Sequence, residues 1–279
     1  MKKKNIIIIS VIGFLLLMIC LPKNPSSQEE VFFTIEKGEG SKDIAFNLEK
    51  KGLVWWSQLF RAYVLVRSTS DELQAGTYRI SPSMSILTMA EKFASGDIAM
   101  GTVTIPEGFT SEQIFQKLQS VRLAGSDPAN LTALQELEGY LFPDTYEIPY
   151  GLDLDKIIKI MTDNFNKKTA GPEITPEAII MASILEKELK TKEDKEIAAG
   201  LLWKRIRVGM PLQVDAHMWT YQNRGLPELP ICNPGLESIE AALSPKDSLY
   251  WYYLSAPDGR TIFSRTLEEH NIAKAKYLK

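Results

Sequence analysis

The chain has 279 residues, of which 44% are hydrophobic and 24% charged, a balance typical of a globular protein with a substantial core. Its 32 basic and 35 acidic residues give a formal net charge of -3, which does not favour a nucleic-acid partner. Two histidines and two cysteines, with no close ligand spacing, argue against a metal centre or a disulfide framework.

The first 24 residues have the pattern of a membrane anchor. Three lysines precede an apolar run over residues 6–21, which approaches the length needed to cross a hydrocarbon core of ~30 Å. A cleaved signal peptide is the alternative, but no small-residue cleavage site follows the run, and the large Ile19 does not suit a lipoprotein site at Cys20. We expect an uncleaved anchor with its lysines in the cytoplasm and the rest of the chain outside. Residues 25–30 form a polar linker.

Residues 31–98 predict a small unit of strands and helices. A strand is expected over 31–37, and a helix with apolar residues at helical spacing follows and ends at Gly52. A second helix is expected over 55–66, a strand in "LQAGTYRIS", and a helix that ends at Gly96.

Residues 99–279 predict a second, mostly helical domain. It begins with the strand "TVTIP", after which Thr110 and Gln113 form the pattern of a capping box. Near its end, Asp258 and Gly259 predict the turn of a β-hairpin, and a final helix is expected over about 266–278. The fold class is therefore α+β.

One acidic residue interrupts an apolar helix. A mostly apolar run over 174–185 leads into Glu186, and helical spacing puts small and apolar residues on the same face: Ile179, Ala182, Ser183 and Leu189. A carboxyl that loses water there keeps its proton nearer neutrality, as a general acid for glycosidic cleavage requires. The alternative is that the helix simply reaches solvent at Glu186. Glu188 points roughly the other way and is a candidate only if the helix is distorted.

Further polar residues gather in short blocks. The stretch 137–151 mixes aromatic rings with carboxylates, which suits a sugar-binding loop or an ordinary aromatic loop on the core. Gln213 and Asp215 lie two apart in an expected strand and would face the same side. Asn233 starts an Asn-Pro-Gly turn, where a capping role is the simpler interpretation. His217 and His270 are isolated, and we assign them no chemistry.

The blocks "IPEGFT", "LEGYLFPDTYEIPYG", "MASILEKE", "RIRVGMPLQVD", "GLPELPICNPGLESIEAALSP" and "TIFSRTLEEHN" occur in this order. Together they resemble the endolytic murein transglycosylases, the YceG-like family, over essentially the whole chain. The resemblance implies a LysM-like subdomain at residues 31–98 and a catalytic domain at 99–279. It also implies a single-pass protein of the cytoplasmic membrane that cleaves nascent peptidoglycan between N-acetylmuramic acid and N-acetylglucosamine outside the cell.

The resemblance also implies roles for individual residues. Glu186 would be the catalytic acid, giving its proton to the glycosidic oxygen and then accepting one from the muramic C6 hydroxyl, which closes a 1,6-anhydro ring without a cofactor. The implied cleft residues are Glu138, Tyr146, Gln213, Asp215, Tyr221 and Asn233. Family membership further implies association with penicillin-binding synthases.

One departure from the family pattern affects the cleft. Only "AHMWTYQNR" separates Asp215 from Gly225, where the family usually has a longer insert. A shortened cleft wall would favour one alternative to the transglycosylase, a non-catalytic glycan-binding or scaffold protein of wall synthesis. A further alternative is a hydrolase with lysozyme-like products.

Overall fold

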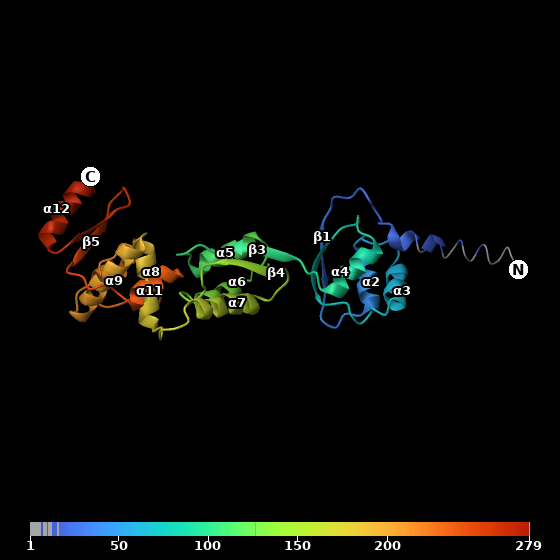
Figure 1. The fold of residues 1–279 in the computed structure, drawn as a ribbon, viewed down its shortest axis with the longest axis horizontal. Coiled ribbons are helices and arrows are strands. Elements are labelled where there is room, and N and C mark those ends of the chain that lie inside the picture. Colours follow the sequence, from blue (N-terminus) through green and yellow to red (C-terminus); the bar gives the residue numbers. More distant parts are fainter. Residues whose placement is uncertain (1–6, 8–9, 11–12, 16, 126, 279) are drawn as a thin grey trace. The chain divides into compact units, whose positions relative to one another are not determined.

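The computed structural model describes residues 7, 10, 13–15, 17–125 and 127–278. The chain divides into two compact units. Unit 1 comprises Met1–Gly101 and Glu147–Leu152, and unit 2 comprises Thr102–Tyr146 and Asp153–Lys279. The division falls at two paired strands, β3 (Met100–Thr104) and β4 (Thr145–Pro149), both of which are labelled in Figure 1.

Of the predicted membrane anchor, residues 1–24, the structure describes residues 7, 10, 13–15 and 17–24, and the rest lies outside the described residues. In the part of the chain that the structure describes, every helix is too short or insufficiently apolar to span a bilayer. Three described residues of this segment, Leu15, Met18 and Ile19, pack against the core of unit 1.

Unit 1 is built on an antiparallel pair of strands, β1 (Val31–Ile35) and β2 (Gly76–Ile80), with Phe33 opposite Tyr78. Its helices are α2 (Ser41–Lys50), α3 (Ser57–Val66) and α4 (Ile86–Ser95). Alternate residues of the strands and one face of each helix form a single apolar core. The predicted end of α4 is confirmed, because Gly96 adopts the left-handed conformation at its C-cap.

The first half of unit 2 contains α5 (Ser111–Ser120), α6 (Pro128–Gln135) and α7 (Leu154–Lys168). The predicted capping box is present: the Thr110 side chain accepts from the Gln113 backbone, and the Gln113 side chain accepts from the Thr110 backbone. This reciprocal cap fixes the loop that enters α5.

The core of unit 2 surrounds α8 (Pro176–Glu188), whose residues from Ala178 to Leu185 are all buried. A helix that is apolar on every side must be enclosed, which explains the long apolar run in the sequence. Helices α9 (Lys192–Arg207) and α11 (Leu236–Leu243) pack against it.

The chain ends with a hairpin and a helix. Strands β5 (Tyr252–Ser255) and β6 (Thr261–Ser264) pair antiparallel around the predicted turn, and α12 (Leu267–Tyr277) packs against both. The short helix α10 (Trp219–Gln222) lies between α9 and α11 in the sequence. The mixed α+β class with a C-terminal hairpin is therefore confirmed.

Candidate active site

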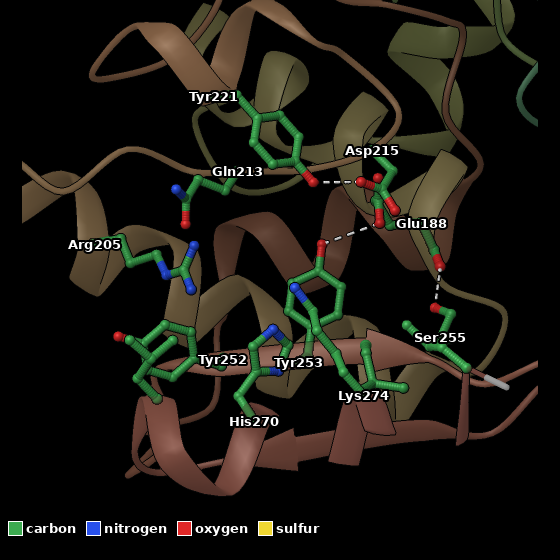
Figure 2. A pocket seen from close by; sticks show the side chains of 13 residues that line it. Glu188, Arg205, Gln213, Asp215, Tyr221, Tyr252, Tyr253, Ser255, His270 and Lys274 are labelled. Carbon is green, nitrogen blue, oxygen red and sulfur yellow. Dashed lines mark hydrogen bonds between the residues drawn. The ribbon is translucent and has the colours of Figure 1, made fainter. Parts of the chain in front are cut away.

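A cavity of about 450 Å³ lies in unit 2 where the end of α8, the segment before α10, the hairpin and α12 meet. Figure 2 shows the side chains around it. Residues from every one of these elements line it: Glu188, Arg205, Gln213, Asp215, Tyr221, Tyr252, Tyr253, Leu254, Ser255, Leu267, His270, Lys274 and Leu278.

Glu188, the last residue of α8, supplies a partly buried carboxyl to this cavity. Burial raises its pKa, and the nearby charge of Asp215 adds to the effect. Its Oε1 accepts from the backbone N–H of Ala216 at 2.6 Å, and its Oε2 accepts from the hydroxyl of Tyr253 at 3.3 Å. The carboxyl can therefore hold a proton to higher pH than usual, and two donors stabilise the anion when the proton leaves.

Tyr253 itself remains a proton donor, because burial first and the charge of Glu188 second raise its pKa well above the usual value. Ser255 donates to the backbone carbonyl of Glu188 at 3.3 Å, which fixes the end of α8 against β5. The hairpin thus holds the Glu188 carboxyl in position at the cavity wall.

Three of the predicted cleft residues share this cavity: Gln213, Asp215 and Tyr221 (Figure 2). The Tyr221 hydroxyl donates to Asp215 Oδ1, and this hydrogen bond is the main reason that the pKa of Tyr221 rises to about 12. Because the bond holds the ring of Tyr221 in place, the carboxylate and the exposed aromatic face form one surface, a combination suited to sugar hydroxyls and sugar rings.

The expected strand around Gln213 is wrong, because the segment has no partner strand. It is held instead by buried Thr220, whose hydroxyl accepts from the Val214 N–H at 3.0 Å. Gln213 has a φ of 52°, which is uncommon for a residue other than glycine and often marks a functional position. Val214 is buried in the core, whereas its neighbours Gln213 and Asp215 both line the cavity. The two residues therefore face the same cavity, as predicted, although the segment is not part of a sheet.

Glu186 lies elsewhere. Its side chain is 9% exposed and its Oε2 forms an ion pair at 3.3 Å with Lys195, which is 3% exposed. The same oxygen accepts from the Gly235 N–H at 3.0 Å and the Ser238 hydroxyl at 2.7 Å. Three donors, one of them cationic, therefore bind a single oxygen of this carboxyl group.

The position of Glu186 explains this arrangement. Gly235 is the N-cap residue of α11, and Glu186 from α8 accepts from its backbone N–H and from the Ser238 hydroxyl in the first turn of that helix. An anion at a helix N-terminus also complements the helix dipole. Residues 186 and 188 lie about 200° apart around a helix, so Glu186 faces α11 while Glu188 faces the cavity.

Glu138 and Asn233 lie together away from the cavity. Asn233 is fully buried: its Oδ1 accepts from the N–H groups of Gly139 and Leu141, and its Nδ2 donates to Glu138 and to a backbone carbonyl. Glu138 also accepts from the Ser111 N–H at the start of α5. Both side chains therefore join loops to one another, and the Asn233 amide has no group left for a ligand.

Tyr146 is also a framework residue. It is buried, its hydroxyl donates to the Phe142 carbonyl at 2.5 Å and accepts from Asn164 at 3.2 Å, and burial raises its pKa to about 12. The predicted cleft set thus divides into three residues at the cavity and three in the framework.

Several cavity residues were missed by the sequence reasoning. Tyr253 and Lys274 line the cavity, and so does His270, to which no chemistry was assigned. Arg205 lies at its base with its guanidinium donating to the carbonyls of Leu212 and Trp251. A usable signal was present: the second acid of "LEKE" falls at the end of the helix, where the chain must leave the core.

A model of the YceG-like family matches residues 33–276. The chain belongs to this family. The matched range includes all the residues that line the cavity except Leu278.

Named relatives agree with the family assignment. A protein of Bacillus subtilis named endolytic murein transglycosylase is 28% identical, and the alignment covers 92% of this chain and 87% of that protein. Its 317 aligned positions exceed the 279 residues of this chain, so the relative contains segments that this chain lacks. A Streptococcus pneumoniae protein of the same name is 25% identical over 92% of this chain and 60% of its own length.

A solved structure agrees as well. The crystal structure of a yceG-like protein from Listeria monocytogenes is 28% identical, with a TM-score of 0.54, and covers 88% of this chain and 99% of its own. The resemblance predicted from the ordered sequence blocks is therefore confirmed.

Proposed function

We propose that this YceG-like chain is an endolytic peptidoglycan lytic transglycosylase in which Glu188, not Glu186, is the general acid and base. The observation that carries the proposal is the meeting of Glu188 with Gln213, Asp215 and Tyr221 in one cavity. Two relatives named endolytic murein transglycosylase support the reaction class.

The reaction needs one carboxyl that first gives and then accepts a proton. Glu188 protonates the oxygen between N-acetylmuramic acid and N-acetylglucosamine as the bond from that oxygen to C1 breaks. The Glu188 carboxylate then takes the proton of the muramic C6 hydroxyl, whose oxygen bonds to C1 and forms the 1,6-anhydro ring. The raised pKa favours the first step, and the donors Tyr253 and Ala216 stabilise the anion between the steps.

Glu186 is less suited to this role because it does not line the cavity, and its Oε2 already pairs with Lys195 and accepts from the Gly235 N–H. Gln213, Asp215 and Tyr221 bind the sugar in our proposal, whereas Glu138, Tyr146 and Asn233 hold the surrounding loops. The tethered C6 nucleophile makes such positioning the main requirement of the second step.

Hydrolysis is a second candidate, supported by the presence of Asp215 in the same cavity as Glu188. Hydrolysing glycosidases use two carboxyl groups, one as the acid and one to activate water or attack carbon. The third candidate function is scaffolding without cleavage. The observation that favours it is the short segment between Asp215 and Gly225.

For the rest of the chain, we propose that residues 1–24 anchor the protein in the cytoplasmic membrane, with the catalytic domain outside. The lysines before the apolar run support this topology. A LysM-like role for residues 31–98 would keep the glycan strand near the enzyme, close to penicillin-binding synthases. Protease accessibility of the catalytic domain in intact spheroplasts tests the orientation, and protection of that domain would contradict it.

Mass spectrometry of strand ends after digestion of purified peptidoglycan tests the reaction. We expect 1,6-anhydro-muramic ends that are absent from a Glu188→Gln digest. Reducing muramic ends would instead indicate hydrolysis, and intact strands would indicate a scaffold.

A further inference from the structure

One face of α12 forms a wall of the cavity. Leu267, His270, Lys274 and Leu278 all line it, and their spacing of three and four residues places them on one stripe of the helix. Figure 2 shows His270 and Tyr252 on the side of the cavity away from Asp215 and Tyr221. The mechanism proposed above uses none of the four α12 residues.

His270 is an unusual component of this wall. It is 7% exposed, its ring stacks on Tyr252 with centroids 5.2 Å apart, and its Nδ1 is buried without a hydrogen-bond partner. We assign the proton to Nε2, because a buried N–H without an acceptor costs more than a buried unprotonated nitrogen. Burial lowers the pKa of His270, and the charges of Lys274 and Arg205 lower it further. His270 is therefore a neutral donor.

Lys274 supplies a cation one turn further along α12. The ion pairs formed by the described residues do not include it. Arg205, the other cation of the cavity, already donates to backbone carbonyls. The cavity is thus polarised, with Glu188 and Asp215 on one side and an ammonium group beside an N–H donor on the other.

From this polarisation we infer a second binding subsite in the cavity. We propose that Lys274 and His270 bind a carboxylate carried by the O3 substituent of the muramic residue. The two donors lie on consecutive turns and would take the two oxygens of one carboxylate, while Leu267 and Leu278 contact its aliphatic part. The inference rests on the proposed function, since only a muramic residue brings this group into the cavity.

Two sources offer such a carboxylate. In strands stripped of peptides the lactyl group is free, and in intact strands the peptide stem ends in a carboxylate. Chito-oligosaccharides contain N-acetylated sugars without either group, so they separate carboxylate recognition from sugar recognition.

The test measures the dissociation constants of the full-length chain for the three ligands in a Glu188→Gln background, which prevents cleavage. Lys274→Gln is compared with Lys276→Gln, which makes the same change of charge on α12 outside the cavity. We expect Lys274→Gln to weaken binding of one carboxylate-bearing ligand about tenfold and to leave chito-oligosaccharide binding unchanged. The ligand whose binding is weakened identifies which of the two carboxylates the subsite binds. Lys276→Gln should leave the affinity for all three ligands unchanged.

His270→Phe provides a second test, because it keeps an aromatic ring against Tyr252 and removes only the imidazole N–H donor. We expect it to weaken the same ligand severalfold. Equal affinities of Lys274→Gln and its parent for both carboxylate ligands, or an equal loss on chito-oligosaccharides, would overturn the subsite. The two proposals can fail separately. If strands bind through Lys274 but the chain with intact Glu188 does not cleave them, the proposed reaction is refuted and the proposed subsite is still supported.

Discussion

Two glutamates separated by a single residue have opposite surroundings in this protein. Glu186 is enclosed where α8 packs against α9 and α11, and its Oε2 pairs with the buried Lys195 and accepts from the N-terminus of α11. Glu188 borders a cavity, where burial and a neighbouring carboxylate favour its protonated form. Burial alone therefore does not define what a carboxyl group can do; the groups that bind its oxygens differ between the two residues.

The largest expected effect is on catalysis at Glu188. Glu188→Gln preserves shape and removes the proton donor, so the rate of strand cleavage should fall by about 10³-fold. The thermal midpoint of unfolding should change little, because the Ala216 N–H still meets an amide oxygen. Cleavage of strands by this variant at the wild-type rate would contradict the proposed role of Glu188.

The second expected effect is on stability at Glu186. Glu186→Gln leaves the Lys195 charge buried without a partner, and the free energy of unfolding should fall by about 3 kcal/mol. Glu240→Gln is the matched control, because it removes the partner of another lysine of α9, Lys192, in an exposed ion pair with α11. Chemical denaturation of both variants should give a much smaller change for the control. Equal, small changes would mean that the buried pair does not stabilise the packing.

A smaller effect is expected at Tyr221, which extends the Glu188 cavity. Tyr221→Ala should weaken glycan binding about tenfold by removing the ring. Tyr221→Phe keeps the ring and loses only the hydrogen bond to Asp215, so it should bind nearly as well as the parent. Unchanged affinity of the alanine variant in calorimetry would mean that this side of the cavity does not contact glycan.

The smallest effect concerns pH. In the proposed mechanism Glu188 acts first in its protonated form, so cleavage should decline as the pH rises through its pKa. The charge of Asp215 raises that pKa, and Asp215→Asn should therefore move the alkaline limb of the profile to lower pH. An alkaline limb that stays at the same pH, or moves to higher pH, would mean that the charge of Asp215 does not raise the pKa of the catalytic acid.

Local signals predicted much of the fold. Capping and turn residues placed the start of α5, the end of α4 and the β5–β6 turn, because each depends on neighbours in the sequence. The segment around Gln213 was predicted to be a strand. A strand needs a partner, and the sequence does not show that Thr220 takes that place.

The site was predicted less completely for the same reason. Helical spacing shows that Glu186 and Glu188 face opposite ways, but the groups that meet each face come from α11 and β5, far away in the sequence. Asn233 and Tyr146 carry polar groups that suit a sugar, yet tertiary contacts use those groups in the framework. The place of His270 in the cavity wall had no local signal, since the other residues of that wall come from distant parts of the chain.

The division of roles between the two glutamates is tested most directly by comparing Glu188→Gln with Glu186→Gln in one strand-cleavage assay. Rates are normalised to the folded fraction, measured at a temperature well below both unfolding midpoints. We predict that folded Glu186→Gln retains most of the wild-type rate while Glu188→Gln loses nearly all of it. The reverse result, an inactive Glu186→Gln beside an active Glu188→Gln, would contradict the account.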